Sequence, residues 1–157
     1  MFGFGKKKVH LQRPCAGQVV PITDVPDPVF SQGIVGEGFA VVPETTTGIF
    51  QVCAPANGTI VSIFPTLHAF AMKTEQGLEL LVHVGLDTVS LQGQGFTSMV
   101  ARGDTVSAGD VILRVDATVL TDHGCSLITP VVATNKKQVS SLALQPTNDI
   151  VCTVTLA

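Results

Sequence analysis

The chain carries little charge, no long apolar run and no paired cysteine motif. Charged residues make up 13% of its 157 residues, the net charge is −3, and the basic residues form no stripe beyond Lys6, Lys7 and Lys8. We therefore do not expect nucleic acid as a partner. No stretch approaches the roughly 20 apolar residues of a membrane span. No apolar segment follows the N-terminal lysines, as a secretory signal would require.

The four cysteines are widely scattered, and none forms a CxxC pair: Cys15, Cys53, Cys125 and Cys152. A structural zinc site usually needs such pairs, so we do not expect one. Isolated cysteines in a chain without an export signal indicate a reducing cytoplasm. We interpret them as small buried apolar residues.

Several catalytic motifs are also absent. The chain has no GxSxG for serine chemistry, no P-loop and no GxGxxG after a strand for nucleotide binding, and no HxH or HExxH for a zinc peptidase. These absences leave the histidines as the main candidates for chemistry.

Short β-branched runs separated by Gly, Pro, Asn and Asp turn signals are the main structural feature of the chain. They occur in a sequence with 45% hydrophobic residues, which is typical of a globular protein. This rhythm predicts an all-β fold, with an antiparallel sandwich or barrel-like core. We expect residues 10–157 to form one domain and residues 1–9 to be a mobile tail.

Few helical turns are expected. Asp116 is a suitable N-cap for a short helix through about Leu120, and a second turn follows Asn135. A closing strand is expected at residues 150–155. Weak internal repeats also indicate duplicated strand motifs, at residues 13–20, 54–61 and 127–132.

Two histidines flank one short apolar hairpin, and the arithmetic of antiparallel pairing relates them. Directly opposed residues have a constant sum of residue numbers, and side chains alternate between the two faces. His68 and His83 sum to 151, so a turn of two or four residues around Gly77 makes them neighbours on one face. A turn of three residues would place them on opposite faces. Two imidazoles within reach of each other indicate a metal site or a paired nucleophile.

Strand alternation divides the hairpin into two faces. The histidine face also carries Phe70, Met72 and Leu81, and the other face collects six apolar residues, Ala69, Ala71, Leu78, Leu80, Val82 and Val84. The second set makes the better core, so we expect the histidine face to be the outer one. Apolar side chains around titratable groups on an outer face indicate a docking surface.

Other interpretations compete with a relay site. Each histidine could simply be satisfied by a backbone carbonyl. A zinc hydrolase would need a third ligand, which Asp87 or Glu79 would have to supply. Residues 102–112 have the Gly-Asp turn spacing of biotinyl and lipoyl carrier domains, and Lys73 resembles their modified lysine. In those carriers, however, the turn precedes the modified lysine. Here Lys73 precedes Gly103, which disfavours a carrier.

Motifs spread over nearly the whole chain occur in the order of one known family. The most specific is His-Val-Gly-Leu-Asp-Thr from His83 to Thr88, after an apolar strand, and the spacing of His68 and His83 also matches. From about residue 12 to the end, the chain resembles the glucose-family enzyme IIA component of the bacterial phosphotransferase sugar-uptake system. Further matching segments are residues 24–30, 34–40, 66–70, 77–82, 93–96, 103–110 and 127–132.

The resemblance implies a phosphoryl relay, in which a histidine accepts phosphate from the phosphocarrier protein HPr and passes it to the IIB domain of a membrane sugar permease. By position, His83 would be phosphorylated, His68 would aid transfer, and Thr66 would support His68. A carbonyl near Gly85 could fix the tautomer of His83. No cofactor is required. Members of the family also bind regulatory target proteins when unphosphorylated, sometimes with zinc shared between the two histidines and a partner carboxylate.

The expected docking surface has an apolar centre and an acidic rim. Phe64, Phe70 and Leu81 form the centre, and Glu37 and Asp87 form the rim. Glucose-specific members often carry an aromatic residue where this chain has Leu81. HPr presents a basic face in this family, so rim charge should govern the encounter rate. A purely regulatory module without phosphate transfer is a further alternative, disfavoured because both histidines are retained.

Overall fold

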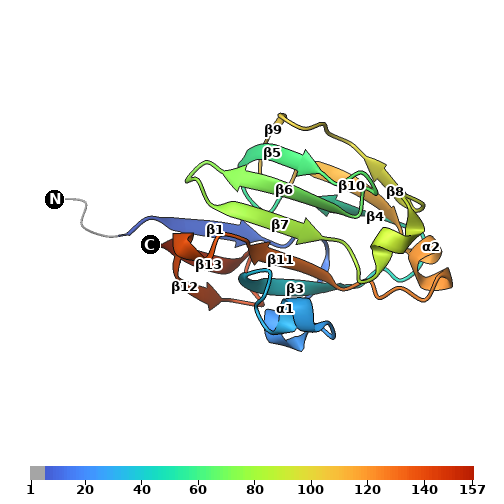
Figure 1. Ribbon diagram of the computed structural model, residues 1–157, viewed down its shortest axis with the longest axis horizontal. Helices are drawn as coiled ribbons and strands as arrows, with labels where there is room; N and C mark the ends of the chain where they lie inside the picture. Colours follow the sequence, from blue (N-terminus) through green and yellow to red (C-terminus); the bar gives the residue numbers. More distant parts are fainter. Residues whose placement is uncertain (1–5) are drawn as a thin grey trace.

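A computed structural model describes residues 6–157, which form three antiparallel sheets (Figure 1). The largest has the strand order β2-β3-β11-β7-β6-β5-β9. Within the described residues its end strands, β2 and β9, do not pair, so the sheet does not close into a barrel. The all-β prediction is confirmed in its open, sandwich form. The strands are β2 (Gly17–Pro21), β3 (Glu37–Pro43), β5 (Gly58–Ile63), β6 (Ala69–Thr74), β7 (Glu79–His83), β9 (Thr105–Val106) and β11 (Thr129–Ala133).

Two three-stranded sheets complete the fold. One has the order β1-β13-β12, and the other has the order β4-β10-β8. Strand β1 includes Lys8 and Val9, which pair with Thr155 and Val154, so the predicted tail is wrong for these two residues. The tail residues 1–5 lie outside the described residues. The strands are β1 (Lys8–Gln12), β4 (Ile49–Cys53), β8 (Phe96–Ser98), β10 (Val111–Asp116), β12 (Val139–Leu144) and β13 (Ile150–Leu156).

The helical elements are short. Helix α2 (Ala117–Asp122) begins after Asp116, whose side chain accepts a hydrogen bond from the backbone of Thr118, and η3 (Lys136–Gln138) follows Asn135, both as predicted. The sequence analysis missed helix α1 (Pro28–Ser31) and the 3-10 turns η1 (Ile22–Asp24) and η2 (Thr88–Leu91). Helix α1 lies against β3 in Figure 1.

The two longer repeated motifs are joined backbone to backbone. The amide of Gln12 donates to the carbonyl of Pro55 at 2.8 Å, and the amide of Cys53 donates to the carbonyl of Pro14 at 2.6 Å. Each proline precedes the glycine that begins a strand, β2 or β5. The reciprocal bonds therefore relate the two motifs in space as well as in sequence.

Buried side chains form two separate clusters. The main core includes Phe70, Met72, Leu80 and Val82 from the hairpin of β6 and β7, together with residues of all three sheets. Phe70 and Met72 are fully buried, so their predicted place on the outer face is wrong. The second cluster lies between α1 and the large sheet and consists of Val25, Phe30, Ala40, Leu86, Ile128 and Val132.

Of the four cysteines, Cys15 and Cys152 are buried, and all four thiols are free. Burial raises the pKa of Cys15 and of Cys152 to about 12, so both behave as apolar core residues. No helix among residues 6–157 is long and apolar enough to cross a membrane.

Candidate functional site

His83 is the last residue of β7, and its ring orientation is set by the turn that follows. Its Nδ1 lies 2.7 Å from the carbonyl oxygen of Gly85. A carbonyl oxygen only accepts hydrogen bonds, so Nδ1 carries the proton and donates it. The expected carbonyl near Gly85 is therefore present. The neutral ring keeps its free lone pair on Nε2, which is the nucleophilic nitrogen.

The residues after His83 form a compact turn, in which each position has a physical role. Val84 and Leu86 are buried and anchor the turn to the two clusters. Gly85 has φ +73°, and a Cβ there would lie 2.6 Å from the carbonyl oxygen of Ser126. The hydroxyl of Thr88 donates to the carbonyl of Val84 at 2.7 Å and closes the turn. The order of residue types in this motif thus follows from holding the Gly85 carbonyl against His83.

His68 lies in the loop before β6 and faces His83. The two ring centroids are 4.9 Å apart, with the ring planes at 77°. The Oγ1 of Thr66 lies 2.5 Å from the Nδ1 of His68. If the hydroxyl donates to Nδ1, the proton of His68 resides on Nε2, where the ring can donate to a group bound at His83. The backbone carbonyl of His68 accepts from Val84 at 2.7 Å, which ties the loop to the end of β7.

The register of the hairpin differs from the one that the numbers suggested. Ala69, not His68, is opposite His83, and the turn between Thr74 and Leu78 contains three residues. Strand alternation alone would then place the histidines on opposite faces. They meet because His68 precedes the first residue of β6 and is not bound by its alternation. The predicted proximity is correct, but the two- or four-residue turn behind it is wrong.

An aromatic ring packs edge-on against each histidine. The Phe30 centroid lies 5.2 Å from that of His83, and the Phe64 centroid lies 5.5 Å from that of His68. Phe30 belongs to α1, whose first turn is capped by Asp27: its carboxylate accepts from the amide of Val29 at 3.0 Å. The capped helix therefore holds a buried phenyl ring beside His83.

Both histidines line a cavity of about 420 Å³. Its walls are mostly apolar, and Val29 and Val89 at its edge are 45% and 55% exposed. Two carboxylates, Asp27 and Asp87, also line it, and no lysine or arginine does. The remaining lining residues are Phe30, Val35, Phe64, Leu81 and Thr88. The site is thus an apolar hollow with acidic side chains at its border.

Both imidazoles are neutral at pH 7. Burial, together with the neighbouring His83, lowers the pKa of His68 to about 4. Burial also lowers the pKa of His83, against the opposing effects of the Gly85 carbonyl, Asp27 and Asp87. A neutral imidazole is a nucleophile and an imidazolium is not, so the environment keeps the pair in its reactive form.

The family model described as "phosphoenolpyruvate-dependent sugar phosphotransferase system, EIIA 1" matches residues 9–139. The chain belongs to this family. The proteins named "PTS system glucose-specific EIIA component" of Staphylococcus aureus (strain Mu50) and Staphylococcus epidermidis (strain ATCC 12228) are each 41% identical to it over 154 residues. These alignments cover 96% of this chain and 90% of each relative. The solved structure "glucose permease IIA from Mycoplasma capricolum" matches with a TM-score of 0.79 and 34% identity, over 97% of this chain and 99% of that one.

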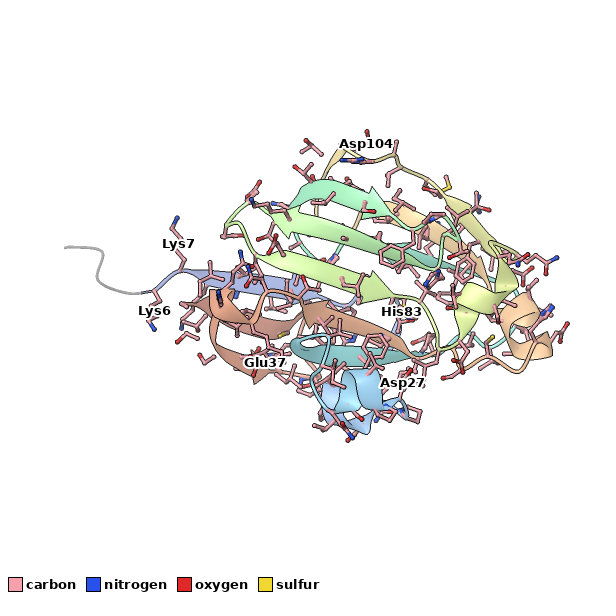
Figure 2. The ribbon with its side chains drawn as sticks, in the orientation of Figure 1. Lys6, Lys7, Asp27, Glu37, His83 and Asp104 are labelled. Atoms are coloured by element: carbon pink, nitrogen blue, oxygen red, sulfur yellow. The ribbon has the colours of Figure 1, made fainter. Side chains whose placement is uncertain are left out.

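In this EIIA chain, some of the predicted docking residues line the cavity and others do not. Phe64, Leu81 and Asp87 line it. Phe70 is fully buried in the main core and is not available to a partner. Glu37 is exposed but does not line the cavity. Figure 2 shows Asp27 on the His83 side of α1 and Glu37 on the opposite side.

Sequence reasoning missed two residues that line the cavity with the histidines, Asp27 and Phe30. The Asp-Pro pair at Asp27 and Pro28 is a helix-start signal, with an acceptor at the N-cap and proline at the first helical position. The helix that follows has only four residues and is too short to show periodicity, so it could not be predicted from apolar spacing.

The zinc hydrolase alternative lacks a third protein ligand. Among residues 6–157, no group of three or more His, Cys, Asp or Glu side chains is arranged to hold a metal ion. Glu79 lies at the other end of β7 from His83, opposite Lys73. The arrangement therefore does not support a catalytic zinc site of the three-ligand type.

Proposed function

We propose that this EIIA chain accepts a phosphoryl group on Nε2 of His83 from HPr and passes it to the IIB domain of a sugar permease. The observation that carries the proposal is the hydrogen bond from His83 Nδ1 to the Gly85 carbonyl, at 2.7 Å. This bond selects Nε2 as the nucleophile and holds the ring in one orientation.

The transfer needs positioning more than covalent assistance. The Nε2 lone pair of His83 forms the new N–P bond as the phosphorus–donor bond breaks, so no proton has to leave His83. His68 would donate from its own Nε2 to a phosphoryl oxygen, with Thr66 donating to His68 Nδ1. The apolar rings of Phe30 and Phe64 would exclude the water that could hydrolyse the phosphohistidine.

The two carboxylates of the cavity would have two effects, one on the encounter with HPr and one on the bound phosphoryl group. Asp27 and Asp87 line the cavity beside His83, and neither has a basic partner there. They would attract the basic face of HPr during encounter. They would also repel the phosphoryl group once it is on His83. This repulsion would keep the phosphorylated state ready to transfer onward to the IIB domain.

The proposed partners place the chain in the cytoplasm, where its four free thiols would remain reduced. The carrier would not contact the sugar. Because its relatives are named glucose-specific components, glucose is the first sugar to test for this chain.

The decisive experiment is reconstitution with enzyme I, HPr and phosphoenolpyruvate, followed by mass spectrometry of peptides from the chain. We expect phosphate on His83 and its discharge when a glucose IIB domain is added. His83→Gln should not be labelled. Phosphate on His68 of the unaltered protein, or labelling of His83→Gln, would refute the assignment.

A second proposed activity is regulatory binding of other proteins in the unphosphorylated state. Each histidine has its Nδ1 engaged, by Gly85 or Thr66, so the two Nε2 atoms fit as neutral zinc ligands. Two protein ligands alone bind zinc weakly, and a partner carboxylate would complete the set. Calorimetry should therefore show weak zinc binding by the chain alone. Tight stoichiometric binding would argue against a shared site.

A further inference from the structure

The contact between the two histidine rings requires an explanation, because the strand register works against it. Ala69 is opposite His83, and by alternation the residue before Ala69 belongs to the other face of the sheet. Nevertheless the ring centroids of His68 and His83 are 4.9 Å apart. The loop between β5 and β6 must therefore redirect the His68 side chain.

This loop contains one residue in an unusual backbone conformation. The amide of Phe64 donates to the carbonyl of Ala69 at 3.0 Å, so residues 65–68 reverse the chain. Leu67, whose amide donates to Phe64 at 2.7 Å, has φ +60°. The left-handed region suits Gly, Asn or Asp, and the Cβ of leucine makes it unfavourable.

A leucine here is explained by where its side chain lies. Leu67 is half-buried and packs against the main core. Its burial offsets the backbone strain and fixes the loop to the sheet. A polar residue would adopt the same backbone more easily but would give no such anchor. Among residues 6–157, the other non-glycine positions with positive φ are Asp87 and Gln92, both exposed.

We propose that Leu67 is a positioning residue: its left-handed backbone turns His68 toward His83, and the burial of its side chain offsets the strain of that backbone. Leu67 does not line the cavity that holds the two histidines, so it would act only through His68. The role in transfer rests on the proposed function, but the geometric role does not.

The two properties of Leu67 can be separated by substitution. Leu67→Val keeps an apolar side chain but strongly disfavours the left-handed backbone, because valine is β-branched. Leu67→Asn keeps the backbone and removes the apolar anchor. Gln92→Val is the matched control, since it forces the same residue type into a left-handed position, φ +53°, outside the cavity lining.

The first readout is the NMR cross-relaxation between the two imidazole rings in the free, unphosphorylated protein. We expect the ring-to-ring cross-peak to be lost in Leu67→Val and kept in Leu67→Asn and Gln92→Val. An intact cross-peak in folded Leu67→Val would overturn the proposal. If that variant does not fold, Leu67→Asn decides alone, because loss of its cross-peak would show that the backbone conformation does not position His68.

The second readout is the rate of phosphoryl transfer to the IIB domain, measured at saturating and at limiting concentrations of that domain. Leu67→Val should lower the maximal rate by roughly a hundredfold, as loss of one stabilising donor does, with little change in the partner concentration at half-maximal rate. Leu67→Asn should stay within a few-fold of the unaltered protein. Equal losses in both variants would refute the inference. The NMR result stands even if the chain accepts no phosphate, so the two proposals fail separately.

Discussion

The Nδ1 atom of His83 donates to the carbonyl oxygen of Gly85, two residues later, at 2.7 Å. The bond spans a turn that only glycine fits, because Gly85 has φ +73° and the space beside its Cα is filled by Ser126 and Thr88. The chemistry of the histidine is therefore coupled to the shape of the backbone next to it.

Gly85→Ala should displace this carbonyl. The added Cβ would lie 2.7 Å from Thr88 Cγ2 and closer still to the Ser126 carbonyl oxygen. We expect a loss of unfolding free energy of about 3 kcal/mol and a mixture of His83 tautomers in nitrogen NMR spectra. Gly124→Ala is the control, because Gly124 has φ +74° with nothing within 4 Å. The Gly124→Ala variant should lose only about 1 kcal/mol of unfolding free energy. Equal losses in the two variants would show that crowding at Gly85 is unimportant.

His68→Gln should separate acceptance of phosphate from its transfer. His83 keeps its hydrogen bond to Gly85 and remains a nucleophile, so labelling from phospho-HPr should persist. Onward transfer to the IIB domain should fall about a hundred- to a thousandfold, because one donor to the phosphoryl oxygens is lost. Rapid-quench measurement of both half-reactions tests this. Unaffected onward transfer would show that His68 is not that donor.

Asp87→Asn should slow the encounter with HPr. Asp87 is exposed at the edge of the cavity and has φ +61°, which asparagine also tolerates, so the backbone should be preserved. We expect phosphorylation to slow several-fold at low salt and the difference to shrink as salt is added. Asp122→Asn, at the end of α2 and outside the cavity lining, is the control. A salt-independent effect of Asp87→Asn would contradict a steering role.

Acid should destabilise the fold through the histidine pair. The pKa of His68 is lowered to about 4 and that of His83 is also lowered, while Asp27 and Asp87 oppose the shift at His83. Below the unfolded value of about 6.5 the unfolded chain binds protons that the folded chain does not. Stability is therefore fully present above pH 6.5 and is lost as pH falls toward 4. Urea unfolding at several pH values should show this slope, and the double variant His68→Gln, His83→Gln should flatten it. An unchanged slope would assign the acid sensitivity elsewhere.

Much of the fold was predictable because turn chemistry and β-branched runs act locally. Asp116 and Asn135 cap their helical turns through their own side chains, and the closing strand β13 is a clear apolar alternation. The pairing of strands within a sheet, in contrast, is not local. Lys8 and Val9 become part of a strand only because β13, more than 140 residues later, supplies hydrogen-bond partners.

The face of the hairpin could not be predicted from alternation, because both faces are apolar. Phe70 and Met72 point into the main core, while Ala69 on the other face is also fully buried. Nor could the register be read from the histidine numbers, since it depends on the three-residue turn between Thr74 and Leu78. The histidine pair itself was predictable, because its spacing and the motif after His83 are specific.

The separation of the second cluster from the main core has a dynamic consequence. The segment from η1 to α1 packs on the small second cluster, which includes Phe30, and not on the main core. Segments with few buried contacts open at a free energy below that of global unfolding. Amide hydrogen exchange should therefore be faster in α1 than in β6 and β7. Each opening would move Phe30 away from His83 and admit water. The lifetime of the proposed phosphohistidine would therefore be limited by how often the four residues of α1 open.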